Sequence, residues 1–181
     1  AGSNKATLEL SAFPNINLTS RLNYLITFPH GCTEQITSGV FPQLYLGDLI
    51  TLDDSKKQSI QRNVNEGIQR LAQRQFSDGG FAYWPGNSYA DDWATSYVGH
   101  FYLEAEKKGY ALPVNSKSNW ISYQQKMARQ WKSNTRYNTD FAQAYRLYTL
   151  ALAGQPDIAS MNRLRETQGI STNTKFRLAA A

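Results

Sequence analysis

The sequence of 181 residues contains a single cysteine and only two histidines. One cysteine cannot form a disulfide within the chain, and so few cysteines and histidines exclude the ligand spacing of a structural zinc site. No run approaches the roughly 20 apolar residues of a membrane-spanning helix, and no phosphate-binding glycine loop is present. The sequence therefore predicts neither a bound metal nor another cofactor.

The positive charge of the chain is also not concentrated in one place. The formal net charge is +5, and the densest basic pairs are Lys56-Lys57 and Lys107-Lys108. These pairs do not alternate with stacking aromatic residues, which favours solvated helix faces over a nucleic-acid surface. Hydrophobic residues make up 41% of the chain and aromatic residues 13%, a composition typical of a folded domain with a sizeable core.

Two kinds of helix are expected to alternate along the chain. One kind is apolar on most sides and the other has a single apolar stripe. The first kind spans 33–50, 92–108 and 139–153, and the second spans 55–75, 116–132 and 156–168. A helix that is apolar all round is buried, whereas a helix with one stripe lies at the surface. The alternation predicts an all-α fold in concentric layers, an α/α toroid like that of the terpenoid cyclases, with an α-solenoid as its main rival.

The beginning and the end of the chain carry weaker patterns. Residues 1–17 are expected to be a cloning remnant followed by a short extended lead-in, and a short helix is expected from Thr19 or Ser20 to Ile26. The last helix closes on three alanines, which propagate a helix rather than end it. Residues 18–181 are therefore expected to be the N-terminal part of an incomplete toroid, truncated within a helix.

The cysteine lies in Pro29-His30-Gly31-Cys32-Thr33-Glu34-Gln35. A thiol and a side-chain amide three residues apart, on a turn that begins with glycine, are the parts of an internal thioester. The Cys32 sulfur attacks the Gln35 amide carbon and expels ammonia. Fixed proximity contributes about 7–11 kcal/mol towards such a barrier. Gly31 permits the close approach, and the amides at the start of the following helix, which Thr33 or the turn itself can begin, can polarise the oxyanion.

A thioester must be shielded from water, and several residues near Cys32 are candidates for that task or for tuning the site. The aromatic candidates are Tyr24, Phe28, Phe41 and Tyr45. His30 either tunes the site electrostatically or packs within the turn.

The pattern Gly31-Cys32-Thr33-Glu34-Gln35 resembles the Gly-Cys-X-Glu-Gln motif of the alpha-macroglobulin and complement family. Further segments are similar to bacterial members of this family, namely 21–25, 41–45, 79–84 and 93–97. The resemblance runs from about Leu18 to the last residue. It implies rather more than the first half of the family's thioester domain, which is an α/α toroid.

The resemblance implies the thioester module of a broad-spectrum protease inhibitor that acts once, not an enzyme. In this family a protease cuts a bait region elsewhere in a longer chain, the thioester becomes exposed, and surface amines of the protease attack it. Cys32 is then the leaving thiol and Gln35 the acyl donor. Glu34 is expected to contribute only polarity and favourable electrostatics at the start of the helix. The implied partners are target proteases and other domains of the same chain. The implied location is the periplasm or cell envelope, with a lipid anchor in many members and a role in host defence.

Several eukaryotic members pass the acyl group to hydroxyls through a later histidine. The later loop around residues 134–138 contains none here. The only other histidine, His100, is expected in the core beside Phe101 and Tyr102. We therefore expect direct attack by amines and slow transfer to hydroxyls.

Two other classes of function remain open. One is a cysteine-dependent hydrolase or transferase, with Cys32 as nucleophile and His30 or His100 as base. The other is a toroid enzyme that uses an aromatic pocket at residues 79–84 or a metal held by Asp91 and Asp92. For these last features the sequence favours a Gly-Gly turn with Phe81 and Trp84 in the core, and a helix cap followed by a first-turn acid.

Overall fold

The computed structural model describes residues 18–133 and 139–181, and these ranges are helical with one isolated bridge between Gln75 and Phe81. The helices are α1 (Leu18–Asn23), α2 (Thr33–Val40), the 3-10 helix η1 (Pro42–Tyr45), α3 (Leu46–Leu49), α4 (Asp54–Ala72), α5 (Asp92–Lys107), α6 (Ser116–Gln130), α7 (Thr139–Leu152), α8 (Ile158–Glu166) and α9 (Thr172–Ala179). The lead-in expected at residues 1–17 lies outside the described residues, and the domain division at residue 18 stays a prediction.

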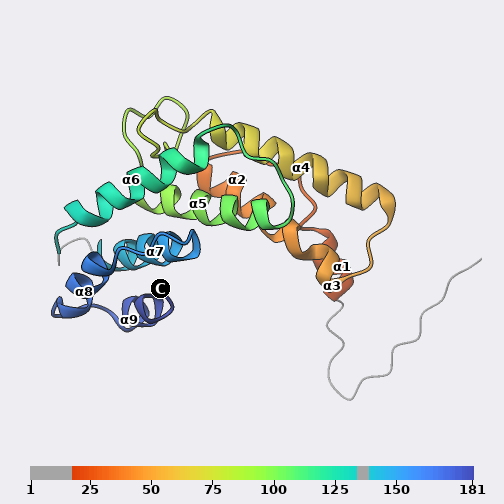
Figure 1. Ribbon diagram of the computed structural model, residues 1–181. Helices are drawn as coiled ribbons and strands as arrows, with labels where there is room; N and C mark the ends of the chain where they lie inside the picture. Colours follow the sequence, from red (N-terminus) through yellow and green to blue (C-terminus); the bar gives the residue numbers. More distant parts are fainter. Residues whose placement is uncertain (1–17, 134–138) are drawn as a thin grey trace, which may run out of the picture.

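The helices form two layers. The inner helices contact one another in chain order, α2 with α5, α5 with α7, and α7 with α9. The outer helices cover them, with α4 on α2, α6 on α5 and α7, and α8 on α7 and α9. Figure 1 shows α4 and α6 running along the same side of α2 and α5. The predicted all-α fold with inner and outer layers, the arrangement of an α/α toroid, is confirmed.

The helix boundaries follow from capping residues and from proline. Asp53, Asp91, Asp157 and Ser171 each accept a hydrogen bond from a backbone N–H in the first turn of the next helix, which satisfies a donor that has no partner within the helix. Pro42 divides the segment 33–50, which was expected to be one helix, into α2, η1 and α3.

The expected extent of the first helix is wrong. Helix α1 begins at Leu18, so Thr19 and Ser20 lie within it, and it ends at Asn23. The amides of Tyr24, Leu25 and Ile26 instead bond to carbonyls three residues earlier. The chain therefore unwinds through tight turns before it reaches Pro29.

The core is filled mainly between α2, α4, α5 and α6. Trp120 is fully buried, and its indole nitrogen donates to the Thr95 carbonyl at 2.9 Å. A Cβ at Gly99 would lie 1.9 Å from the Trp120 ring, so α5 leaves the space that this ring occupies. Within the described part of the chain, no helix combines the length and apolar character needed to cross a bilayer.

Candidate functional site

Cys32 and Gln35 face each other at the start of α2. Cys32 is the N-cap residue, and its sulfur accepts a hydrogen bond from the Gln35 backbone N–H at 3.4 Å. In return, the Cys32 backbone N–H donates to Gln35 Oε1 at 2.9 Å. This reciprocal pair is a capping box in which cysteine takes the position usually held by serine or threonine. The thiol and the amide are thus held together by the geometry of a helix start.

Gly31 is required by this arrangement for two reasons. Its φ of +101° is a conformation that residues with a side chain rarely adopt. In addition, a Cβ at this position would lie 2.1 Å from Gln35 Oε1 and 2.9 Å from Gln35 Cδ. Any side chain here would therefore displace the Gln35 amide from its place beside Cys32.

A distant loop fixes the motif from one side. The Thr33 backbone N–H donates to the Tyr83 carbonyl at 2.9 Å, and the Thr33 hydroxyl donates to the Ala82 carbonyl at 2.5 Å. Phe81, which precedes Ala82 in this loop, is fully buried, as predicted. Trp84 is 49% exposed, so its predicted place in the core is wrong. The chain turns outward at this residue, whose N–H donates to Asn87 in an exposed turn.

Arg74 holds the motif from the end of α4. Its guanidinium donates to the Gly31 carbonyl at 2.7 Å and to the Thr33 hydroxyl at 3.2 Å, the residues on either side of Cys32. Burial lowers the pKa of Arg74, and its electrostatic interaction with Cys32 acts in the opposite direction. A cation therefore lies within electrostatic reach of the sulfur, and nothing in the sequence around Arg74 indicates this placement.

The Tyr83 hydroxyl contacts Glu34, which lies two residues after Cys32 in the motif. Its hydroxyl donates to Glu34 Oε2 at 2.7 Å. This hydrogen bond raises the pKa of Tyr83, and a second interaction of the hydroxyl, with the Cys32 side chain, raises it further. Tyr83 lies in one of the segments that carry the family resemblance, which is a signal that the residue matters but not that its hydroxyl reaches the motif.

Cys32 and Gln35 differ in exposure. Cys32 is buried, with 3% of the residue exposed, whereas Gln35 is exposed. Solvent therefore reaches Gln35, while Cys32 is covered by the protein.

The four aromatic residues expected to shield the site lie in different surroundings. Tyr24 is 79% exposed and Phe28 is 49% exposed. Phe41 packs against aromatic rings of α5. The Tyr45 hydroxyl donates to Glu104, and burial together with this bond raises the pKa of Tyr45 to about 12. A shielding role for these residues stays a prediction.

Both histidines interact with groups other than the cysteine. His30 is exposed, and its Nδ1 lies 2.9 Å from the Phe28 carbonyl, a contact within the turn. His100 is half-buried in the inner layer, with Nδ1 at 3.0 Å from the Tyr145 hydroxyl, and burial lowers its pKa. These contacts are those of a turn residue and of a residue packed between α5 and α7.

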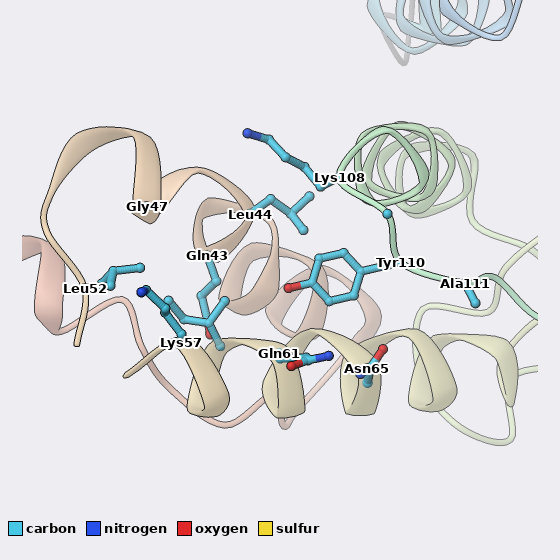
Figure 2. Close-up of a pocket in the computed structure, with 12 residues that line it drawn as sticks. Gln43, Leu44, Gly47, Leu52, Lys57, Gln61, Asn65, Lys108, Tyr110 and Ala111 are labelled. Carbon is cyan, nitrogen blue, oxygen red and sulfur yellow. The ribbon is translucent and has the colours of Figure 1, made fainter. Parts of the chain in front are cut away.

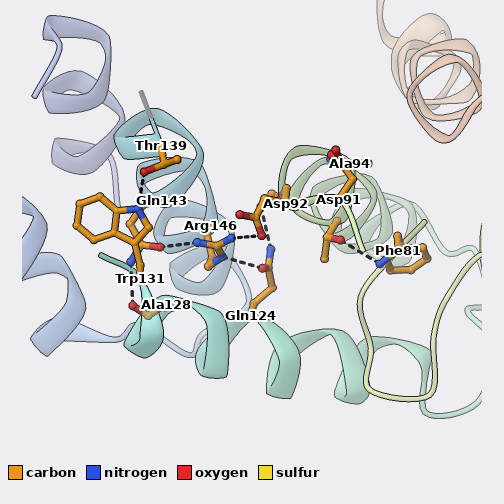
Figure 3. Close-up of polar contacts among 12 residues, drawn as sticks. Phe81, Asp91, Asp92, Ala94, Gln124, Ala128, Trp131, Thr139, Gln143 and Arg146 are labelled. Carbon is orange, nitrogen blue, oxygen red and sulfur yellow. Dashed lines mark hydrogen bonds and ion pairs between the residues drawn. The ribbon is translucent and has the colours of Figure 1, made fainter. Parts of the chain in front are cut away.

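Asp91 and Asp92 have the structural roles that the sequence favours. Asp91 caps α5, and Asp92 forms an ion pair at 2.6 Å with Arg146, whose side chain is 1% exposed. Figure 3 shows Arg146 between Gln143 on one side and Asp92 with Gln124 on the other; its guanidinium also donates to the side-chain oxygens of Gln124 and Gln143. No group of three or more His, Cys, Asp and Glu residues that could hold a metal occurs within residues 18–133 and 139–181.

A pocket of about 410 Å³ lies elsewhere on the molecule, between the η1–α3 segment, α4 and the residues that follow α5 (Figure 2). Its lining is mixed and includes Leu44, Leu52, Lys57, Lys108 and Tyr110. The residues of the Cys32 motif do not line it. Cys32 and Gln35 thus lie at a helix start outside this pocket.

Comparison with known proteins gives consistent matches. Residues 7–140 match the family model described as the A-macroglobulin TED domain. Alpha-2-macroglobulin of Escherichia coli K12 is 34% identical over 113 residues, which is 60% of this chain and 7% of that protein, and that of Rickettsia conorii is 27% identical over 81% of this chain and 8% of that protein. This chain thus spans less than a tenth of the length of these curated relatives.

Solved structures agree. The crystal structure of Salmonella alpha-2-macroglobulin reacted with methylamine superposes with a TM-score of 0.75 and 27% identity, over 92% of this chain and 12% of that chain. Native Escherichia coli alpha-2-macroglobulin from domain MG7 to the C-terminus gives a TM-score of 0.70 and 25% identity, over 92% of this chain and 31% of that chain.

Proposed function

Because this chain belongs to the A-macroglobulin TED-domain family, we propose that it is the thioester module of a protease trap, with the bond formed between Cys32 and Gln35. The observation that supports the proposal is the capping box, in which the Cys32 sulfur accepts from the Gln35 backbone N–H and the Gln35 side-chain oxygen accepts from the Cys32 backbone N–H, so both side chains belong to one helical turn.

The contacts of the box suit the chemistry. In thioester formation the sulfur bonds to Gln35 Cδ, the bond from Cδ to the amide nitrogen breaks, and ammonia leaves with the thiol proton. Negative charge develops on Gln35 Oε1, which already accepts the Cys32 backbone N–H at 2.9 Å. A fixed donor at the atom where charge develops lowers the barrier because it needs no reorganisation.

The trapping reaction is the reverse attack by a different nucleophile. A surface amine of a protease attacks the acyl carbon of Gln35, the carbon–sulfur bond breaks, the sulfur takes up the proton that the amine loses, and the protease stays attached through an amide. Each module reacts once, so the protein is an inhibitor and not an enzyme. The Salmonella relative was crystallised after reaction with methylamine, which supports an amine as nucleophile. The partners are then target proteases and other domains of a longer chain, in the bacterial cell envelope.

The competing enzyme hypotheses have less support. A cysteine hydrolase needs a base directed at the sulfur, whereas His30 interacts with the Phe28 carbonyl and His100 with Tyr145. A toroid enzyme that uses residues 79–84 or Asp91 and Asp92 conflicts with the buried Phe81 and with the ion pair to Arg146.

Intact mass and cysteine alkylation test the proposal. A thioester lowers the mass by one ammonia and protects Cys32 from alkylation until methylamine is added. Cys32→Ala must abolish the mass deficit, because it removes the only thiol of the chain. Peptide mapping detects a thioester that formed and was then hydrolysed, because hydrolysis leaves Glu at position 35. Gln43 is the control: it is buried and has no cysteine three residues before it, so it should stay unchanged. A free Cys32 next to an unmodified Gln35 would contradict the proposal.

A second measurement concerns the nucleophile. Methylamine should be incorporated faster than glycerol, because His30 and His100 are held in the contacts described above and hydroxyl transfer has been linked to a histidine in related proteins. Faster uptake of glycerol would refute this preference for amines.

A further inference from the structure

We propose that Arg74 is a positioning residue for the thioester chemistry and acts on the Gln35 side-chain oxygen through the peptide bond between Gly31 and Cys32. The inference rests on the proposed thioester function and adds a role for a cation that lies 43 residues after Gly31. Arg74 acts on the group that contacts the reacting oxygen, which is the Cys32 backbone N–H.

The two ends of one peptide unit carry the connection. The Gly31 carbonyl accepts from the Arg74 guanidinium at 2.7 Å. The Cys32 N–H, which belongs to the same unit, donates to Gln35 Oε1 at 2.9 Å. A peptide unit is planar, and its C=O and N–H point in opposite directions. The guanidinium, the peptide unit and the Gln35 oxygen therefore form one chain of hydrogen bonds.

This chain strengthens the donor at the atom where charge develops. A cation at the carbonyl oxygen draws electron density from the peptide unit and makes its N–H a stronger donor, because hydrogen bonds in a chain polarise one another. A hydrogen bond from a charged group is also stronger than one between neutral groups. When an oxyanion forms on Gln35, it is thus stabilised by the Cys32 N–H and, behind it, by the positive charge of Arg74.

Arg74 also fixes the direction of this peptide unit. Its planar guanidinium has a second acceptor, the Thr33 hydroxyl at 3.2 Å, so the fork sets how Gly31 lies relative to the first residue of α2. The Arg74 backbone is attached as well, because its carbonyl accepts from the Ala82 N–H at 3.0 Å. A glycine backbone has more rotational freedom than that of any other residue, and these contacts hold the Cys32 N–H in its direction.

The role applies to both directions of the reaction. In thioester formation the sulfur bonds to Gln35 Cδ, and the amide nitrogen leaves as ammonia with the thiol proton. In opening, an amine bonds to the same carbon, the carbon–sulfur bond breaks, and the sulfur takes up the proton that the amine loses. Both steps pass through a tetrahedral carbon whose negative oxygen is Oε1. Arginine keeps its proton in proteins, so Arg74 supplies charge and direction but no proton.

A structural explanation for Arg74 also exists, because positive charge is favourable at the C-terminus of a helix such as α4. Arg70 allows the two explanations to be separated. It lies one turn earlier on the same helix and is half-buried like Arg74, but it pairs with Glu66 at 2.6 Å and lies over the Phe28 ring. Arg70→Ala therefore removes an equal charge from the end of α4 and leaves the bond to the Gly31 carbonyl in place.

The test compares Arg74→Ala with Arg70→Ala. The readout is the rate at which methylamine releases the Cys32 thiol, at a temperature where circular dichroism shows each protein to be folded. Loss of a whole oxyanion donor costs about 100–1,000-fold in rate, and Arg74→Ala weakens this donor without removing it, so we expect a loss of about 10-fold. Arg70→Ala should react at the parent rate. An unchanged rate in Arg74→Ala, or an equal loss in both variants, would overturn the proposal.

A spectroscopic readout follows the donor itself and needs no thioester. The proton chemical shift of the Cys32 backbone N–H reports the strength of its hydrogen bond, and it is measured with Gln35 as an amide, either unreacted or after methylamine. We expect this proton to move upfield in Arg74→Ala and to keep its parent shift in Arg70→Ala. Gly86→Ala controls for lost stability, because it introduces backbone strain where a Cβ meets no atom within 4 Å, and it should keep the parent rate and shift. A rate loss in Arg74→Ala at an unchanged Cys32 shift, or one shared by Gly86→Ala, would show a structural role only and overturn the proposal.

The same samples distinguish this proposal from the thioester itself. An unmodified Gln35 beside a free Cys32 in the parent protein, together with the upfield shift in Arg74→Ala, refutes the thioester alone. A thioester that methylamine opens equally fast in the parent and in Arg74→Ala refutes the role of Arg74 alone.

Discussion

Gly31→Ala is the substitution for which the structure makes its sharpest prediction. A side chain at φ +101° costs about 1–2 kcal/mol of backbone strain. The new Cβ would also lie 2.1 Å from Gln35 Oε1, so the amide must move and the capping box is lost. Loss of a cap costs about 1 kcal/mol. We therefore expect the free energy of unfolding to fall by about 2–3 kcal/mol and thioester formation to be abolished.

Gly86→Ala is the matched control. Gly86 also has a positive φ, +85°, but a Cβ there meets no atom within 4 Å. The control should lose only the strain, about 1–2 kcal/mol, and should keep the mass deficit and the protection of Cys32 from alkylation. Urea denaturation of both variants, with intact mass on the same samples, measures the difference. If Gly31→Ala matched Gly86→Ala in stability and kept the thioester, the steric argument for Gly31 would be refuted.

Three further predictions concern charged and titratable groups. Arg74→Gln removes the two hydrogen bonds from the guanidinium to Gly31 and Thr33. The free energy of unfolding, measured by urea denaturation, should fall by about 1–2 kcal/mol. An unchanged value would contradict a stabilising role for these two bonds. Asp92→Asn leaves the buried Arg146 guanidinium without its counter-charge. Because Asp92 is 47% exposed, the free energy of unfolding should fall by about 1–3 kcal/mol. The control Asp54→Asn, at a first-turn acid whose side chain is 92% exposed, should change it by less than about 0.5 kcal/mol. Burial lowers the pKa of His100 below 6.5, so the unfolded chain binds a proton at this residue more readily than the folded chain does. The free energy of unfolding should therefore fall as the pH decreases from about 6.5 towards the folded-state pKa. His100→Gln should flatten this pH dependence, and an equal slope in both proteins would refute the lowered pKa of His100.

Local patterns predicted the layers because they depend on neighbours in sequence. The alternation of fully apolar and striped helices follows from burial on one or both sides, and it gave the inner and outer helices correctly. Pro42 and Asp91 acted as a helix breaker and a cap, which are effects within one turn of the chain.

The surroundings of the reactive pair depended on contacts that sequence patterns do not carry. Arg74 reaches Gly31 across 43 residues, and Tyr83 reaches Glu34 across 49. The outward turn at Trp84 was missed because a tryptophan three residues after the buried Phe81 has the residue type of a core position. The spacing of Cys32 and Gln35 was visible, but cysteine is not among the usual cap residues, so the capping box itself was not predicted.

The capping box makes the first turn of α2 report on the chemistry of the site. In the amide form the Gln35 N–H is held by the Cys32 sulfur, and a sulfur bonded to an acyl carbon is a poorer acceptor for that donor. Under the proposed function, formation of the thioester would exchange a hydrogen-bonded helix start for a covalent one, and an amine that opened the bond would return the cap to the helix. A chemical event at one carbon is in this way also a local folding event, which amide hydrogen exchange at Gln35 would record.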